Sequence, residues 1–246
     1  MARYLKRSPR MLWNLGMVLA LPFIVLGARA AKRSHGPHVP SITNRFNSRI
    51  LGTGLWGMAS RGSGPPEVTD VRHNFIRNDD WQGGEGWIYM IDPHLAQALY
   101  WVAPAPYLGD QTGQYGRVLF FRLASDKNSE YASRVWPRVI LVGNGGDSLF
   151  YKDSTLKMPV ASPIFSKPRF QSYWIPLNEG VNWKIKRPTL SLHKPSRIEF
   201  CAVLNQLTSL MIQAEFTKAK ETDVLDDVEW GAALAPVDLG HLCIIP

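Results

Sequence analysis

Residues 100–116 of this chain spell Y-W-V-A-P-A-P-Y-L-G-D-Q-T-G-Q-Y-G. The first three residues are aromatic or β-branched, which predicts a short strand. Pro104 and Pro106 end that strand, and the Leu-Gly-Asp-Gln run at residues 108–111 is typical of a tight turn that leads into another strand. The stretch therefore predicts a β-rich domain.

Similar short runs of β-branched and aromatic residues continue on both sides, separated by Gly, Pro, Asn and Asp. We expect eight strands, at residues 86–91, 100–102, 118–123, 135–142, 148–152, 170–177, 208–216 and 224–230. Alternation within two of them assigns one set of side chains to the core: Leu119, Phe121, Leu123, Leu210, Ile212, Ala214 and Phe216. The intervening Met211, Gln213 and Glu215 are expected to face outward. The glycine-rich residues 143–147 predict a hairpin turn.

One helix is expected among these strands. Ser196 and Glu199 have the spacing of a capping box, in which the serine side chain and the glutamate satisfy the first backbone N–H groups. The apolar residues that follow recur at helical spacing and predict one buried stripe: Phe200, Val203, Leu204 and Leu207. Such a helix would cover one end or face of the strands.

Several motifs follow one another in the order and spacing of a known family. They are E-G-W at residues 85–87, the stretch at 100–116, W-I-P-L-N-E at 174–179, P-S-R-I-E-F at 195–200, I-Q-A at 212–214 and L-D-D-V at 225–228. Together they resemble the laminin IV (laminin B) domain. The resemblance implies an all-β, jelly-roll-like sandwich with one inserted helix, acting as a binding module without catalytic activity. The cysteine-rich EGF-like repeats that accompany such domains are absent from this chain, so it resembles an isolated domain.

The net charge of +8 is unevenly distributed. Residues 1–66 hold 10 Lys and Arg and no acidic residue, whereas residues 67–246 hold 18 Lys and Arg against 20 Asp and Glu. A nucleic-acid-binding module concentrates its cations on the folded surface that meets phosphate. The predicted domain has no such excess, so nucleic acid is not an expected partner.

The basic N-terminal part contains an uncharged run of 18 residues, 11–28, preceded by four basic residues. Three interpretations remain open: a secretory signal peptide cleaved after the Ala-Arg-Ala at residues 28–30, an uncleaved membrane anchor, and a mitochondrial sorting segment. We therefore divide the chain into a signal or anchor at 1–30, a basic extended tether at 31–66, a sandwich at 67–231 and a C-terminal tail at 232–246.

Candidate contact residues are the aromatic side chains in or beside loops and in the tether. These are Trp56, Trp81, Tyr107 and Tyr115, whose rings could meet a protein or the face of a sugar. Catalysis is not expected, because the sequence contains no G-x-S-x-G motif and the histidines of the domain lie in no recognisable catalytic pattern.

Two further sites are hypotheses of the sequence. Asp79 precedes the first expected strand and Asp226 lies in the last one. The two carboxylates could share a structural calcium. The alternative is that both are ordinary surface carboxylates. Cys201 and Cys243 could form a disulfide in an oxidising compartment, the alternative being one buried thiol and one tail thiol. No other cofactor is expected.

The sequence thus predicts a non-catalytic binding or adhesive module that acts outside the cytosol, as a secreted or extracellular protein. Expected partners are proteins, with a glycan as a further ligand and a membrane contacted through residues 11–30. The alternative is a membrane-anchored accessory subunit of a larger membrane assembly, such as one of the mitochondrial inner membrane.

Overall fold

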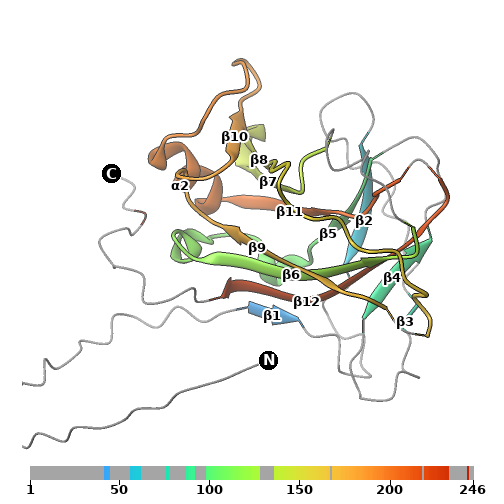
Figure 1. Ribbon diagram of the computed structural model, residues 1–246. Helices are drawn as coiled ribbons and strands as arrows, with labels where there is room; N and C mark the ends of the chain where they lie inside the picture. Colours follow the sequence, from blue (N-terminus) through green and yellow to red (C-terminus); the bar gives the residue numbers. More distant parts are fainter. Residues whose placement is uncertain are drawn as a thin grey trace, which may run out of the picture. The chain divides into compact units, whose positions relative to one another are not determined.

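The computed structural model describes residues 42–44, 56–61, 76–77, 87–91, 98–127, 136–166, 168–217, 219–232 and 243. Within these residues the strands form two six-stranded antiparallel sheets, and one α-helix packs near the end of the second sheet (Figure 1). The expected all-β sandwich with an inserted helix is confirmed.

The first sheet has the strand order β3-β4-β12-β6-β9, with β1 pairing on β12. Its strands are β1 (Ile42–Asn44), β3 (Ile76–Arg77), β4 (Ile88–Ile91), β6 (Val118–Ser125), β9 (Gln171–Pro176) and β12 (Thr222–Ala232). The pairing of β12 with β6 shifts register between Asp226 and Glu229, and Asp227 has a positive φ of 47° there. This irregularity is a β-bulge in the centre of the sheet.

The second sheet has the order β10-β8-β7-β11-β5-β2. Its strands are β2 (Gly57–Arg61), β5 (Ala98–Val102), β7 (Val139–Gly143), β8 (Ser148–Tyr151), β10 (Trp183–Lys186) and β11 (Leu207–Gln213). The expected hairpin turn joins β7 to β8 through the short 3₁₀ helix η3 (Asn144–Gly146), in which Gly145 and Gly146 both have positive φ.

The sandwich begins earlier in the chain than predicted. β1 and β2 lie within residues 31–66, the expected tether, and they pair with β12 and β5. The G-M-A-S-R sequence of β2 has no β-branched residue and little alternation, so its strand conformation comes from pairing with β5 and not from local preference. The boundary at residue 67 is therefore wrong, because strands of both sheets precede it.

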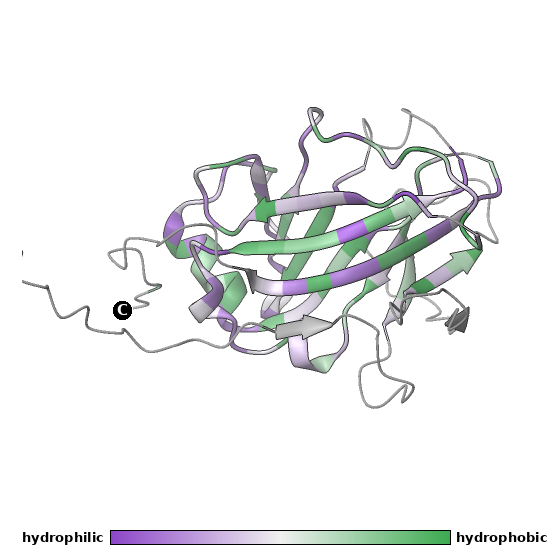
Figure 2. Cartoon of the chain, turned by 60° about the horizontal axis from the view of Figure 1, so that its bottom comes forward, coloured by the Kyte–Doolittle hydropathy of each residue, from purple (hydrophilic) through white to green (hydrophobic). Residues whose placement is uncertain are grey.

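The core lies between the inner faces of the two sheets. The side chains predicted to be inside from β6 and β11 are buried, and Phe121 stacks on Tyr173 with ring centroids 5.1 Å apart. Figure 2 shows hydrophobic and hydrophilic residues alternating along the long strands. This alternation is the pattern from which the inner faces were predicted.

The outer face of the second sheet is also buried, which the alternation did not indicate. Met211, Gln213 and Glu215 do not face solvent, because their exposed fractions are at most 4%. Side chains of this face form a second apolar cluster, which contains Ala59, Ala98, Tyr100, Ile140, Phe150 and Met211. The prediction that these three residues face outward to water is therefore wrong, because all three are buried.

The helix α2 (Arg197–Asn205) begins as the sequence predicted. The Ser196 side chain accepts from the Glu199 backbone N–H, and the Glu199 carboxylate accepts from the Ser196 N–H at 2.8 Å. Its buried residues include Phe200, Val203 and Leu204. α2 approaches β7 so closely that a Cβ added at Gly143 would lie 3.1 Å from the Val203 Cα.

The stretch that identified the fold connects β5 to β6 and packs against α2. It contains the 3₁₀ helices η1 (Ala105–Tyr107) and η2 (Thr112–Gln114). Gly109 between them has φ of 84° and pairs with Leu207, and the Gln111 N–H donates to the Leu204 carbonyl at 2.8 Å. The turn therefore caps the C-terminal end of α2 while placing β6 in the first sheet.

Candidate binding surface

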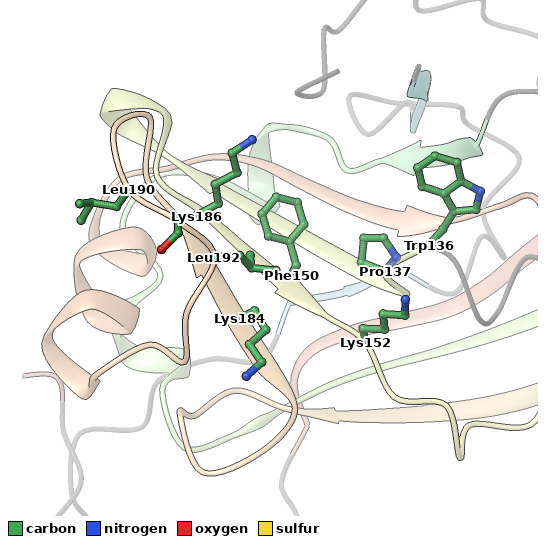
Figure 3. Close-up of a pocket in the computed structure, with 9 residues that line it drawn as sticks. Trp136, Pro137, Phe150, Lys152, Lys184, Lys186, Leu190 and Leu192 are labelled. Atoms are coloured by element: carbon green, nitrogen blue, oxygen red, sulfur yellow. The ribbon is translucent and has the colours of Figure 1, made fainter. Parts of the chain in front are cut away.

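A recess of about 530 Å³ opens on the outer side of the second sheet. It is lined by residues from β8, β10, the segment before β7 and the connection from β10 to α2: Trp136, Pro137, Phe150, Lys152, Lys184, Lys186, Leu190, Ser191 and Leu192. In the view of Figure 3, Phe150 lies between Leu190 on one side and Trp136 on the other. We call this surface the lysine recess.

Strand β10 supplies two of the three lysines because its sequence alternates. Trp183 and Ile185 are buried in the core, so Lys184 and Lys186 project from the opposite face. Antiparallel pairing places Lys184 opposite Phe150 and Lys186 opposite Ser148 on β8. The third amine, Lys152, directly follows β8.

The floor of the recess is apolar and its rim is cationic. Phe150 is almost fully buried, whereas Leu190 and Leu192 are 51% and 57% exposed. Three of the described lining residues are lysines and none is acidic. The arrangement can hold a ligand that presents an apolar face together with negative charge.

One wall of the recess is the connection from β10 to α2, and ion pairs fix it to the sandwich. His193 exchanges two backbone hydrogen bonds with Ile185, at 2.8 and 3.1 Å. Arg187 contacts Asp147 at 3.4 Å and Glu199 at 3.3 Å. Leu190 and Leu192 are thus held over the edge of the sheet.

The same contacts change the acidity of two groups in this wall. Hydrogen bonds to the Ser191 carbonyl and to the Glu199 carboxylate raise the pKa of His193 above its usual value. The backbone N–H of Ser196, followed by the Ser196 hydroxyl, His193 and Arg187, lowers the pKa of Glu199 to about 2. Glu199 is therefore ionised throughout the neutral range and favours the charged form of His193.

The aromatic residues predicted for ligand contact lie elsewhere. Trp56 and Tyr107 pack together inside the core with centroids 5.4 Å apart, and the Tyr107 hydroxyl donates to the Val228 carbonyl. Tyr115 is also buried and donates to Glu179. These three rings are core residues, so the prediction that they contact a ligand is corrected, and Trp81 lies outside the described residues.

Asp226 of the hypothetical calcium site is engaged in an ion pair. Its carboxylate lies 2.5 Å from Arg122, which also contacts Asp227 at 2.8 Å. Burial raises the pKa of Asp226 to about 7, and neighbouring Asp227 adds to this shift, although Arg122 opposes it. Asp79 lies outside the described residues, and no group of three potential ligands occurs within them, so the calcium site stays a prediction.

The structure places the two cysteines in contact. Cys201 on α2 and Cys243 are joined as a disulfide with a Cα–Cα distance of 5.6 Å. In the described part of the chain no helix is long and apolar enough to span a membrane. Residues 11–30 lie outside that part.

Sequence patterns did not indicate the lysine recess. Trp136 and Phe150 were placed within expected strands, and Lys184 and Lys186 lie in a strand that was not expected. The W-K-I-K alternation at residues 183–186 was the available signal, since it combines an apolar face with a cationic one. Trp174 on the first sheet is 49% exposed, and its ring lies 4.3 Å from that of Phe120.

Comparison with solved structures supports the fold. The L4b domain of human laminin alpha-2 superposes with a TM-score of 0.54 at 13% sequence identity, covering 79% of this chain and 97% of that domain. Two other structures are more distant. An exo-beta-agarase has a TM-score of 0.42 at 11% identity, covering 80% of this chain and 26% of that one. A family 30 carbohydrate-binding module has a TM-score of 0.36 at 12% identity, covering 81% of this chain and 100% of that one.

Comparison with sequences gives the family. No curated protein matches the chain. The family profile described as Laminin B (Domain IV) matches residues 100–241, more than half of the chain, and its span includes the 100–116 stretch, α2 and the last two strands. The chain therefore belongs to the laminin B (domain IV) family.

Proposed function

We propose that this protein is a non-catalytic binding module of the laminin IV type that acts outside the cytosol. The observation that carries the proposal is the lysine recess. Its volume of about 530 Å³ falls in the range of ligand-binding pockets, and it combines an apolar floor with a few polar groups on the rim. Membership of the laminin B family supports a binding role over catalysis.

The cysteine pair supports the proposed location. Disulfides form and persist in oxidising compartments and are rare in the cytosol. Cys201 is buried against the core and is bonded to Cys243 from the C-terminal tail. A basic N-terminal segment followed by 18 uncharged residues is consistent with export of the chain.

The alternative remains a membrane-anchored accessory subunit that keeps residues 11–30. The observation that favours it is the absence of acidic residues up to position 66, because mitochondrial presequences are poor in acids and rich in arginine. In that case the basic residues before the sandwich would contact neighbouring subunits.

One experiment separates the two. The full chain is expressed with a C-terminal tag in a eukaryotic cell that secretes protein, and the mature N-terminus is determined by mass spectrometry. The proposal expects the chain in the medium, cleaved after Ala30, with Cys201 and Cys243 bonded. A chain that keeps residues 11–30 and stays in a membrane fraction would contradict the proposal and favour the membrane-anchored accessory subunit.

The non-catalytic part of the proposal has its own measurement. A bound ligand incubated with the purified chain should be recovered with unchanged mass. Any turnover would contradict this part. Turnover that is lost when the recess lysines are replaced would place an active site in the recess, and turnover that survives would place it elsewhere in the chain.

A further inference from the structure

We infer that the lysine recess is the surface by which this chain docks on a membrane that contains anionic lipids. Lys184 and Lys186 contact the lipid phosphates, while Leu190 and Leu192 enter the boundary between the headgroups and the acyl chains. This inference rests on the proposed function, since it names the partner of the same site.

The wall of the recess presents two leucines to the outside. Leu190 and Leu192 lie two residues apart, and more than half of each side chain is exposed. The wall that carries them is fixed by the hydrogen bonds of His193 to Ile185 and by the ion pairs of Arg187. The apolar contact comes from these leucines, because the ring at the floor of the recess belongs to a buried cluster.

The two lysines of β10 lie on the same side as one of these leucines. The backbones of Ile185 and His193 pair as antiparallel neighbours, and the Ile185 side chain is buried. The adjoining residues of both segments face the opposite way, so Lys186 comes beside Leu192 on the outer side (Figure 3). Lys184 projects from that same face of β10. Amines and an apolar side chain are therefore presented together.

Positive charge is concentrated in this part of the domain. Residues 183–199 hold five Lys and Arg and one acidic residue, whereas residues 67–246 hold 18 Lys and Arg against 20 Asp and Glu. A negatively charged membrane surface attracts such a basic segment and turns it toward the lipid. We assign no lipid contact to Lys152, which has other contacts in the structure.

The residue types favour a membrane over a protein partner. Lysine is depleted in protein interfaces, and leucine is under-represented among the residues that dominate their binding energy. Lysine beside leucine is typical of segments that lie in the membrane interface, where the lysine stem follows apolar surface and the amine stays among the headgroups. The half-buried Trp136 on the rim is also a residue type that is enriched at this depth.

Two other kinds of anionic partner explain less of the surface. A small anion could be held by both lysines at once, but it would leave the two leucines in water. A peptide commonly adds a strand to an exposed sheet edge. β10 is an edge strand, but its outward hydrogen bonds at Ile185 are already made with His193.

The test measures co-sedimentation of the secreted chain with lipid vesicles. One set of vesicles is phosphatidylcholine alone, and the other is an equal mixture of phosphatidylcholine and phosphatidylglycerol. The chain should bind the mixed vesicles and not the neutral ones, and binding should weaken as salt is added. Every variant keeps the basic residues 31–66, so their attraction to the vesicles is the same in all comparisons.

A first pair of variants tests the lysines. K184A/K186A should lower the partition coefficient about thirtyfold at low salt, the effect of two lysines at an anionic surface. K127A/K220A removes the same charge from exposed positions outside the recess. This control should change the partition coefficient by less than about twofold.

A second pair tests the leucines. L190S/L192S should lower the partition coefficient about tenfold, because the leucines no longer leave water on binding. Both positions are exposed, so this variant should keep the fold, which circular dichroism checks. V160S/F165S replaces two side chains that are 50% and 54% exposed outside the recess and should leave binding unchanged.

Hydrogen exchange locates the contact and also applies to a chain that keeps residues 11–30. Residues 187–193 should exchange more slowly with the mixed vesicles than with the neutral ones. A chain that is bound to the mixed vesicles but shows unchanged exchange in this segment would overturn the recess as the docking surface.

The remaining outcomes are distinct. Equal binding to both kinds of vesicle, or equal losses in a variant and its matched control, overturns the inference. A loss in K184A/K186A with none in L190S/L192S shows attraction without insertion and overturns it too. Soluble polyglutamate that binds as tightly as the mixed vesicles, with the same sensitivity to both variants, would assign the recess to acidic proteins instead. None of these results changes the mature N-terminus or the location of the chain, so the inference can fail while the proposed function stands.

Discussion

At the scale of single residues, the cluster of Arg122, Asp226 and Asp227 shows a contact of Asp226 that the sequence did not indicate. Asp226 stands out in the sequence as part of a paired carboxylate, but its partner lies 104 residues away on β6. The bulge in β12 lets both carboxylates reach one guanidinium, over which the Phe170 ring packs at 4.8 Å. Only the register between the two strands reveals this ion pair.

Replacement of Arg122 by methionine should destabilise the domain by about 3 kcal/mol, because Asp226 would remain buried without its cation. Burial already raises the folded pKa of Asp226 above its unfolded value. The folded state then holds the proton more tightly, so the penalty should grow as the pH rises from about 5 to 8. Urea unfolding at both pH values measures this, with Lys184→Met as the control, and a penalty equal at the two pH values would contradict it.

Leu210 tests the assignment of the inner face of β11. This side chain is fully buried, so Leu210→Asp should cost several kcal/mol and leave most of the chain unfolded at room temperature. Leu192→Asp adds the same charge at an exposed position and should change the unfolding free energy by less than about 0.5 kcal/mol. Circular dichroism during urea titration compares the two, and two equally stable variants would show that the inner face is wrongly assigned.

At the scale of elements, the sequence predicted those whose local signals are strong. All eight expected strands occur, and α2 starts at its capping box, because short-range patterns determine these features. β1, β2, β3 and β10 were not expected, since each has only two to five residues and depends on pairing with another strand. Short strands of this kind carry too little periodicity to be recognised alone.

β2 should be necessary for stability although it lies outside the domain boundary that the sequence indicated. A chain starting at residue 67 lacks β2 and the buried Trp56, and so exposes the edge of β5 and the ring of Tyr107. Loss of the tryptophan alone should cost about 3–5 kcal/mol. Thermal melting should show a cooperative transition for a chain starting at residue 36 and none, or a much lower one, for the chain starting at 67. Equal melting temperatures for the two chains would show that β2 adds no stability and acts only as part of a tether.

The wall of the lysine recess should respond to pH through His193. Its folded pKa is raised, so the pairing with Glu199 contributes fully below the unfolded value of about 6.5 and is lost as pH rises through the folded pKa. Hydrogen exchange of residues 187–193, corrected for intrinsic rates, should therefore be slower at pH 6 than at pH 8. His193→Gln should remove the difference in exchange between pH 6 and pH 8. Equal protection of residues 187–193 at the two pH values in the wild-type chain would show that His193 does not fix this wall.

At the scale of the whole molecule, the fold was predictable but the binding surface was not. The recess is assembled from the segment before β7, from β8, and from β10 with its connection to α2, so its lining residues extend in sequence from Trp136 to Leu192. The predicted contact aromatics were chosen because they border loops, yet Tyr107 and Tyr115 fall in turns that pack against the core. A pattern along the chain shows which residues alternate but not which loop covers them.

The disulfide links the stability of the whole molecule to its compartment. It joins Cys201 in α2 to Cys243 beyond the last strand and closes a loop with a sequence separation of 42, which by chain entropy contributes about 2–4 kcal/mol. Reductant should lower the melting temperature of the wild-type chain by several degrees and leave that of Cys201→Ser/Cys243→Ser unchanged. A wild-type chain that melts at the same temperature with and without reductant would show that the bond adds no stability. The bond should also be present in protein purified under non-reducing conditions with thiols blocked at lysis. Its absence would remove the support that the cysteines give to an oxidising compartment. A retained membrane anchor would then be the better explanation of residues 11–30.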